Sequence, residues 1–318
     1  MNKALLYPAL TVLIWSGFVL VSRVGGLSPL TAYDQTAIRF ATAALVLLPV
    51  WWWRGEGLTT LLHWRRWVLA AIGGAGYSLL MFSGFERAPA SHGGLLLPGL
   101  IPFGTLLWAW FLLRRPLQIL NAGLGLASLG LAGFALVSVE FSRETLLGDA
   151  LFVAAVLAWT AYTTLAYRWQ VAAWDAACSL ALLTSLAYLP IWFWLLPSGL
   201  AEANLSQILV QALYQGVIAI VVAMFFYLRG AELIGPDRMG LSLALVPAVV
   251  AASAPWLLNE PVRGPVLACI ALVVAGAGLG LWLSRPPSQS RGHGDPGEHQ
   301  QGGEQAELGK PAVAVRRR

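Results

Sequence analysis

Residues 83–117 read SGFERAPASHGGLLLPGLIPFGTLLWAWFLLRRPL, and residues 228–262 read LRGAELIGPDRMGLSLALVPAVVAASAPWLLNEPV. Near its start, each stretch has a glycine and a glutamate two residues apart. Each then continues as a proline-interrupted apolar run and has its last proline one residue before its end. The same spacing of about 145 residues places Trp15 over Trp159 elsewhere in the chain. We therefore interpret the chain as one structural unit that occurs twice.

The composition is that of a membrane protein. Of the 318 residues, 58% are hydrophobic and 11% are charged, whereas a soluble domain averages about 25% charged residues. A membrane-spanning helix needs roughly 20 apolar residues, and runs of this length without strand alternation predict helices. We expect an all-α fold with ten transmembrane helices, near residues 4–22, 33–53, 67–85, 90–113, 118–138, 148–167, 176–196, 206–228, 238–258 and 263–283.

The basic residues predict the orientation of these helices. Fifteen of the 20 Lys and Arg fall at the N-terminus, in the even-numbered loops or in the tail, so both termini are expected to be cytoplasmic. Five is an odd number, so the two five-helix units, residues 1–140 and 141–283, must insert as inverted repeats. Inverted repeats are typical of secondary transporters, which bind substrate near the midplane between the repeats. Residues 284–318 are polar and charged, and we expect a disordered cytoplasmic tail.

Three stretches resemble the EamA-type branch of the drug/metabolite transporter superfamily: Arg39-Phe40, residues 83–117 and residues 228–262. The resemblance extends from Ala4 to Leu283, and within the branch the chain is similar to bacterial aromatic amino acid exporters. It implies a bacterial inner-membrane protein that exports aromatic and other neutral amino acids by alternating access. Family members usually carry a glutamate before the last proline of both stretches. This chain has Glu260 in the second stretch and Arg115 in the first.

Aromatic and polar residues inside the predicted spans are the candidates for substrate binding. Trp15 and Trp159 are the only tryptophans near mid-span, and they are equivalent between the repeats. They are interpreted either as core packing or as the wall of a cavity suited to amino acids or flat aromatic metabolites. The full set of predicted substrate contacts is Trp15, Tyr77, Ser78, His92, Trp159, Tyr162, Thr163, Tyr214 and Gln215.

Two cationic or titratable residues have alternative interpretations. A lone histidine such as His92 is more often a hydrogen-bonded interfacial residue than a proton relay. Arg39 lies six residues into its span and needs a partner, because a bare charge in the membrane is costly. We expect it to contact helix-end carbonyls or Glu86, with substrate contact as the alternative.

Missing motifs narrow the function further. No carboxylate lies at the centre of a predicted span, which favours a facilitator or exchanger over an ion-coupled pump. The sequence has no phosphate-binding glycine-rich loop with lysine and no hydrolase motif, so an enzyme is not expected.

The expected partners are a small-molecule substrate and the lipid bilayer, and we expect no cofactor, metal or nucleic acid. Small residues on the last span are interpreted as intramolecular packing, so a monomer is favoured. The alternative function is export of other small metabolites or drugs, with or without proton coupling.

Overall fold

The computed structural model describes residues 3–55, 61–114, 127, 130, 131, 134, 142–234, 239 and 242–283. Every regular element within these residues is a helix, which confirms the predicted all-α class. Contacts group Met1–Ser284 into one compact unit. The predicted tail and most of the span expected at 118–138 lie outside the described residues, so the count of ten helices stays a prediction.

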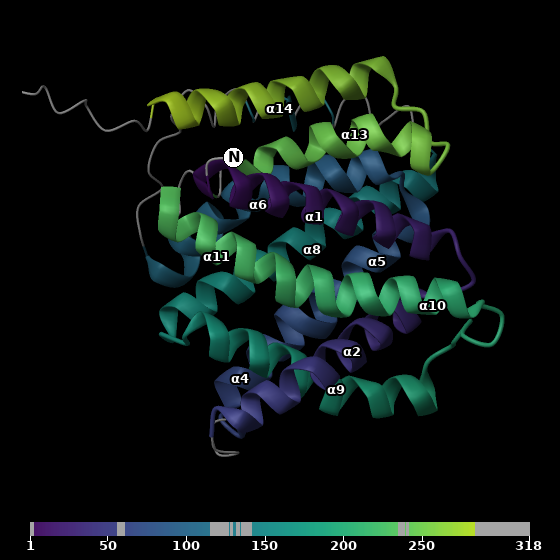
Figure 1. The fold of residues 1–318 in the computed structure, drawn as a ribbon. Coiled ribbons are helices and arrows are strands. Elements are labelled where there is room, and N and C mark those ends of the chain that lie inside the picture. Colours follow the sequence, from purple (N-terminus) through teal and green to yellow (C-terminus); the bar gives the residue numbers. More distant parts are fainter. Residues whose placement is uncertain are drawn as a thin grey trace, which may run out of the picture. The chain divides into compact units, whose positions relative to one another are not determined.

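The helices follow the two-repeat pattern of the sequence (Figure 1). The first half contains α1 (Lys3–Gly26), α2 (Ala32–Trp53), α4 (Trp64–Leu69), η1 (Ala70–Gly76), α5 (Tyr77–Arg87) and α6 (Ala90–Leu113). The second half contains α8 (Arg143–Arg168), α9 (Ala173–Leu195), α10 (Leu205–Gln211), η2 (Ala212–Val222), α11 (Ala223–Ile234), η3 (Leu243–Leu245), α13 (Val246–Leu257) and α14 (Gly264–Leu283). Apart from the span at 118–138, each predicted span corresponds to a described helix. Most helix ends lie within several residues of the predicted ends.

The helices have the length and surface of membrane spans. Within the described residues, seven helices are long and apolar enough to cross a membrane, counting α4–η1–α5 and α10–η2–α11 as one helix each. Large apolar side chains are exposed on their outer faces, for example Leu45 at 74% and Leu186 at 65%. Trp53 and Trp194, at 86% and 78% exposed, lie at helix ends, where tryptophan favours the membrane interface. An apolar exterior of this kind is stable in lipid and not in water.

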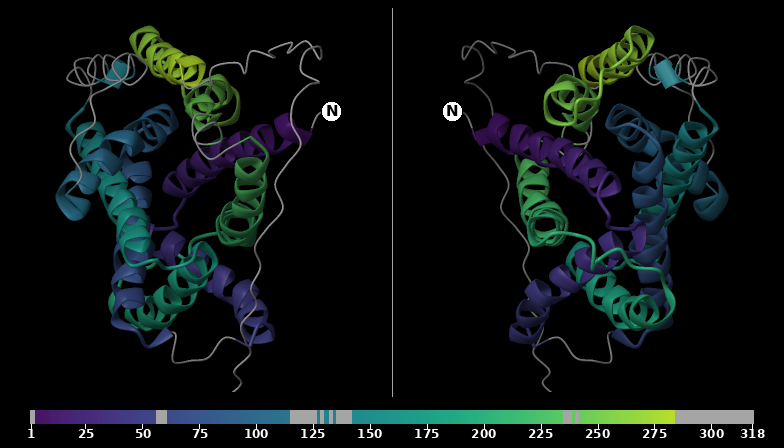
Figure 2. Two further views of the ribbon diagram at one scale, coloured as in Figure 1. Left: turned by 90° about the vertical axis from the view of Figure 1, so that its left-hand side faces the viewer. Right: turned by 90° about the vertical axis from the view of Figure 1, so that its right-hand side faces the viewer.

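The interior carries an unusual number of polar side chains for so apolar a chain. Hydroxyl, amide, carboxylate and guanidinium groups on α1, α2, α8, α9 and η2 are buried between the helices. Helix α2 packs against α9, and α1 packs against α11 and η2, so segments from opposite halves lie side by side (Figures 1 and 2). Polar groups in lipid must find partners inside the bundle, so these interhelical surfaces are where a polar site can exist.

Two π-helical segments occupy equivalent places in the repeats. Segment η1 lies in the middle of the span from Trp64 to Arg87, and η2 lies in the middle of the span that starts at Leu205. A π-helix widens the helical turn, and such segments occur frequently at functional sites. The sequence analysis did not predict them. The run AAIGGAG in η1 was the available signal, because its glycines loosen the helix.

Candidate functional site

Three predicted aromatic residues form one cluster between the repeats. The rings of Tyr77 and Trp159 lie 5.1 Å apart between centroids, and those of Trp159 and Tyr162 lie 5.3 Å apart. Tyr77 begins α5 in the first repeat, directly after η1, and the other two lie on α8 in the second repeat. We call these three residues the aromatic cluster. Tyr162 is 8% exposed and packs on Phe40 of α2, which joins the cluster to a third helix.

A glycine allows the two repeats to approach closely at the aromatic cluster. A Cβ atom at Gly73 in η1 would lie 2.5 Å from Cγ of Tyr162, closer than real side chains approach one another. The glycine backbone therefore lies directly against the tyrosine ring. The ring of Tyr162 occupies the space that a side chain at Gly73 of η1 would need.

The other two predicted aromatic residues, Trp15 and Tyr214, lie outside the aromatic cluster and have different partners. Trp15 stacks on Tyr227 of α11, with centroids 6.0 Å apart and planes 2° apart. The hydroxyl of Tyr214 donates to the carbonyl of Ile14 at 3.1 Å and fills the space beside Gly17. Trp15 and Trp159 thus each contact a tyrosine of the opposite repeat, and the structure shows no ring contact between the two tryptophans.

A column of polar side chains lies between α1, α2 and the α10–η2 helix. It consists of Ser22, Gln35, Arg39, Gln211 and Gln215, which we call the polar column. Arg39 is 7% exposed, and the other four are at most 1% exposed. The Nη1 of Arg39 donates to Oε1 of Gln215 at 3.3 Å, and Nε2 of Gln215 donates to the hydroxyl of Ser22 at 2.9 Å. Sequence analysis had singled out Gln215 of this set as a substrate contact.

The surroundings of Arg39 differ from those expected. Its guanidinium lies over the rings of Phe18 and Phe40, with the central carbon 5.2 and 5.8 Å from their centroids. Phe40 belongs to the same apolar cluster as Tyr162 and Trp159, so it connects the polar column to the aromatic cluster. The expected contact with Glu86 or with helix-end carbonyls is wrong. Glu86 instead accepts from the amide of Ala32 and from Arg87, and no described carboxylate forms an ion pair with Arg39.

His92 is part of a buried ion pair rather than of the aromatic cluster. Its Nδ1 lies 2.9 and 3.2 Å from the two carboxylate oxygens of Asp149 on α8, and the two residues are 1% and 8% exposed. Asp149 is the second residue of the span predicted at 148–167, and the sequence analysis overlooked it. The prediction that no carboxylate lies at the centre of a span is not contradicted by Asp149, but this acid near a helix end is buried by neighbouring helices.

Two predicted hydroxyl contacts have different surroundings. Ser78 follows Tyr77 and is fully buried, yet its hydroxyl has no hydrogen-bond partner among the described residues. The hydroxyl of Thr163 donates to the carbonyl of Thr160 on its own helix at 3.1 Å. Ser78 retains hydrogen-bonding capacity next to the aromatic cluster.

Asp34, also fully buried, has a structural role. Its oxygen atoms accept hydrogen bonds from the backbone and hydroxyl of Thr31, from the indole of Trp192, from the hydroxyl of Ser198 and from the amide of Gly199. These five bonds, between 2.6 and 2.9 Å, cap α2 and fasten it to the segment after α9. No acceptor capacity remains for a ligand.

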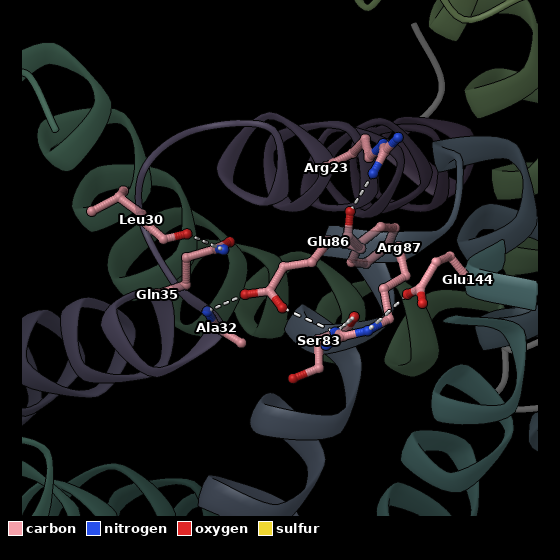
Figure 3. A network of polar contacts seen from close by, with 9 residues as sticks. Arg23, Leu30, Ala32, Gln35, Ser83, Glu86, Arg87 and Glu144 are labelled. Atoms are coloured by element: carbon pink, nitrogen blue, oxygen red, sulfur yellow. Dashed lines mark hydrogen bonds and ion pairs between the residues drawn. The ribbon is translucent and has the colours of Figure 1, made fainter. Parts of the chain in front are cut away.

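A second group of charges connects helix ends near this cap. Nε of Arg23, at the end of α1, lies 2.6 Å from Oε1 of Glu260. The Nη1 atom of Arg23 donates to the carbonyl of Phe85 at 2.5 Å, the bond drawn from Arg23 in Figure 3. The other carboxylate oxygen of Glu260 accepts from the amide of Ala90 at 2.9 Å, at the start of α6. We call Arg23, Phe85, Ala90 and Glu260 the end network. It ties the segment after α13 to three helices of the first repeat.

The neighbouring contacts of Glu86 and Arg87 are more exposed. Glu86 accepts from the amide of Ala32 at 2.6 Å and from Arg87 at 3.0 Å (Figure 3). Arg87 also reaches Glu144 of α8 at 3.8 Å. The side chains of Arg87 and Glu144 are 36% and 70% exposed, so these ion pairs contribute little to stability.

Comparisons with known proteins agree with the two-repeat architecture. The model of a family described as the EamA-like transporter family matches residues 2–139 and again residues 146–282. A solved crystal structure, described only as that of a protein, is 23% identical with a TM-score of 0.60 and covers 89% of this chain and 98% of its own. That likeness shows the fold alone. A comparison with curated proteins found no match.

Proposed function

The chain belongs to the EamA-like transporter family, a membrane transporter of the drug/metabolite type, and on this premise we propose that it exports amino acids. The proposed substrates are aromatic and other neutral amino acids, and the proposed location is a bacterial inner membrane with both termini cytoplasmic. The observation that carries the proposal is the aromatic cluster, which joins the repeats and is linked through Phe40 to the buried Arg39. An aromatic wall with a few oriented polar groups is what binding sites for small organic molecules commonly have.

The proposed mechanism is alternating access between two inverted five-helix repeats. Both mid-span tryptophans contact tyrosines of the opposite repeat, and the π-helical segments lie next to these contacts: η1 directly precedes Tyr77, and Tyr214 of η2 bonds the carbonyl of Ile14. Flat contacts of aromatic rings on glycine-containing helices can slide and re-form as the repeats rock. The end network supports one end of the path being closed, and the distribution of basic residues makes this the external end.

Counterflow into proteoliposomes tests the proposal. Vesicles preloaded with unlabelled amino acids are challenged with labelled tryptophan, phenylalanine or threonine, beside empty vesicles. We expect saturable uptake that is weakened in a Trp159→Ala protein, because this substitution removes the centre of the aromatic cluster. Trp194→Ala is the matched control, since this tryptophan lies at the end of α9 with its side chain 78% exposed. Uptake of none of the three by folded protein would refute amino acid export and favour another small metabolite or drug.

A second candidate, proton-coupled export, is favoured by the buried pair of His92 and Asp149. Imidazole is the side chain that ordinarily gains and loses a proton near neutral pH, and carriers commonly bury titratable pairs on the path of the coupling ion. A facilitator or exchanger predicts counterflow that does not respond to a proton gradient. A coupled exporter predicts accumulation driven by the gradient, and that response should disappear in His92→Asn.

A further inference from the structure

Among the described residues, three of the six buried side-chain polar atoms without a hydrogen-bond partner lie close together in the chain's fold. They are Nε of Arg39, a donor, and the Oε1 atoms of Gln35 and Gln211, which are acceptors. All three belong to the polar column. A buried polar group without a partner costs roughly 1–3 kcal/mol, and more if it is charged, so three in one column call for an explanation.

The unpartnered atoms lie one helical turn apart on facing helices. Gln35 and Arg39 are four residues apart on α2, and residues at this spacing are neighbours on one helix face. Gln211 and Gln215 repeat the spacing where α10 continues into η2. The column thus has one level with an unpartnered donor at Arg39 and one with unpartnered acceptors at Gln35 and Gln211.

The remaining bonds of these side chains hold them in position. The amide nitrogen of Gln211 donates to the carbonyl of Val21 at 2.7 Å, and that of Gln35 donates to the carbonyl of Leu30 at 3.4 Å. Both amides lie where a Cβ atom of Gly25 would be, so the missing side chain leaves room for them. Gln215 bridges Ser22 and Arg39. The free atoms are therefore the oriented ends of side chains that are anchored elsewhere.

We infer that the polar column binds the zwitterionic backbone of an α-amino acid, with its carboxylate on Arg39 and its ammonium group on the amide oxygens of Gln35 and Gln211. This inference rests on the proposed function and identifies the chemistry that substrates share. Guanidinium is the side-chain group best suited to a carboxylate, and neutral oxygens satisfy an ammonium group without adding a net charge. The column supplies one cation for the carboxylate and two neutral amide oxygens for the ammonium group.

The neighbouring charges support this assignment of the carboxylate to Arg39 and of the ammonium group to Gln35 and Gln211. Asp34, the residue directly before Gln35 on α2, has its oxygens occupied by five donors and is unable to hold the ammonium group. No described carboxylate forms an ion pair with Arg39, so the substrate carboxylate does not have to displace one. The guanidinium of Arg39 lies over the ring of Phe40, which packs in one apolar cluster with Tyr162 and Trp159. A substrate held by its backbone at the column can therefore direct an aromatic side chain towards the aromatic cluster.

Substrate analogues that each lack one charge test the inference on the unmodified protein. Labelled tryptophan counterflow is measured with unlabelled tryptophan, tryptamine, which lacks the carboxylate, or indole-3-propionate, which lacks the ammonium group, as the competitor. Loss of a charge-assisted hydrogen bond weakens binding about 10- to 100-fold, so both analogues should inhibit at least 10-fold more weakly than tryptophan. Equal inhibition by all three compounds would overturn the inference.

Variants assign each charge to its partner. In Arg39→Gln, the apparent KM for tryptophan should rise about 10- to 100-fold, while inhibition by tryptamine should be unchanged. In Gln35→Met or Gln211→Met, discrimination against indole-3-propionate should shrink instead. Arg66→Gln is the control, because it removes a guanidinium that pairs with Asp175 and Ser179 outside the column. Arg39→Lys, which keeps the charge but not the planar donors, serves if Arg39→Gln does not fold.

The outcomes separate this inference from the proposed function. Counterflow of tryptophan with an unchanged KM in Arg39→Gln would overturn the inference and leave amino acid export standing. Absence of counterflow for every amino acid in the unmodified protein would overturn both. A loss of activity that is equal in Arg39→Gln and Arg66→Gln would assign Arg39 a structural role.

Discussion

The end network offers the sharpest perturbation of the transport cycle, because one carboxylate connects the two repeats. Replacing Glu260 by glutamine keeps the shape of the side chain but removes its charge. Oε1 accepts from Arg23 at 2.6 Å and Oε2 accepts from the amide of Ala90 at 2.9 Å. An amide has a single acceptor oxygen, so in the variant one of these two donors faces an NH₂ group.

The size of the effect follows from burial. The side chains of Arg23 and Glu260 are 11% and 18% exposed, so solvent screens their attraction only weakly. A hydrogen bond to a charged group contributes about 1.5–3 kcal/mol, which corresponds to roughly a 10- to 150-fold change in an equilibrium constant. The equilibrium between the closed and open forms of this end should shift towards the open form by that factor.

Hydrogen–deuterium exchange in lipid nanodiscs measures this shift directly. Amides of residues 85–92 and 257–263 should exchange faster in Glu260→Gln, while those in α2 should keep their rates. Arg87→Gln is the matched control: its ion pairs with Glu86 and Glu144 are exposed, are worth about 0–1 kcal/mol and should change exchange at most a few-fold. Unchanged exchange in Glu260→Gln, or equal changes in both variants, would refute the reasoning.

Two further substitutions probe the contacts that hold the repeats together. Asp34→Asn leaves at least one of five buried donors without an acceptor. We expect a loss of about 3 kcal/mol or more of stability, measured as a lower midpoint of thermal unfolding in detergent. An unchanged midpoint would show that the cap of α2 is dispensable. Gly73→Ala places a Cβ 2.5 Å from Tyr162, so the ring must move at a cost of about 1–3 kcal/mol. Tryptophan counterflow should therefore fall more than in the control Gly264→Ala, where an added Cβ meets no atom within 4 Å. Equal activities of the two variants would contradict a tight contact at Gly73.

The fold was largely predictable from sequence because lipid leaves the backbone few choices. Long apolar runs in a membrane must satisfy their hydrogen bonds internally, so each run becomes a helix. The ends differ from prediction where local chemistry extends the helix. For example, α8 begins at Arg143 rather than at 148, because Ser142 caps its first turn through the amide of Thr145.

The candidate site was predictable in its residue types but not in its pairings. The repeat correctly singled out Trp15 and Trp159 as equivalent, yet each stacks on a tyrosine from the other half. Which helices adjoin is decided by tertiary packing, so the 57-residue separation of His92 and Asp149 carried no signal. The π-helical segments were missed for a related reason: a single wide turn does not change the apolar composition of a span.

Arg39 shows how an energetic argument can identify a partner that composition does not. A cation inside a span is costly unless it is paired, and the sequence offered Glu86 as a nearby anion. The structure assigns Glu86 to Ala32 and Arg87, and gives Arg39 a neutral amide and two aromatic faces. Such contacts compensate only part of the cost of burying a guanidinium and leave its Nε unsatisfied. Under the inference drawn above, a substrate carboxylate would supply the hydrogen-bond acceptor that Nε of Arg39 lacks.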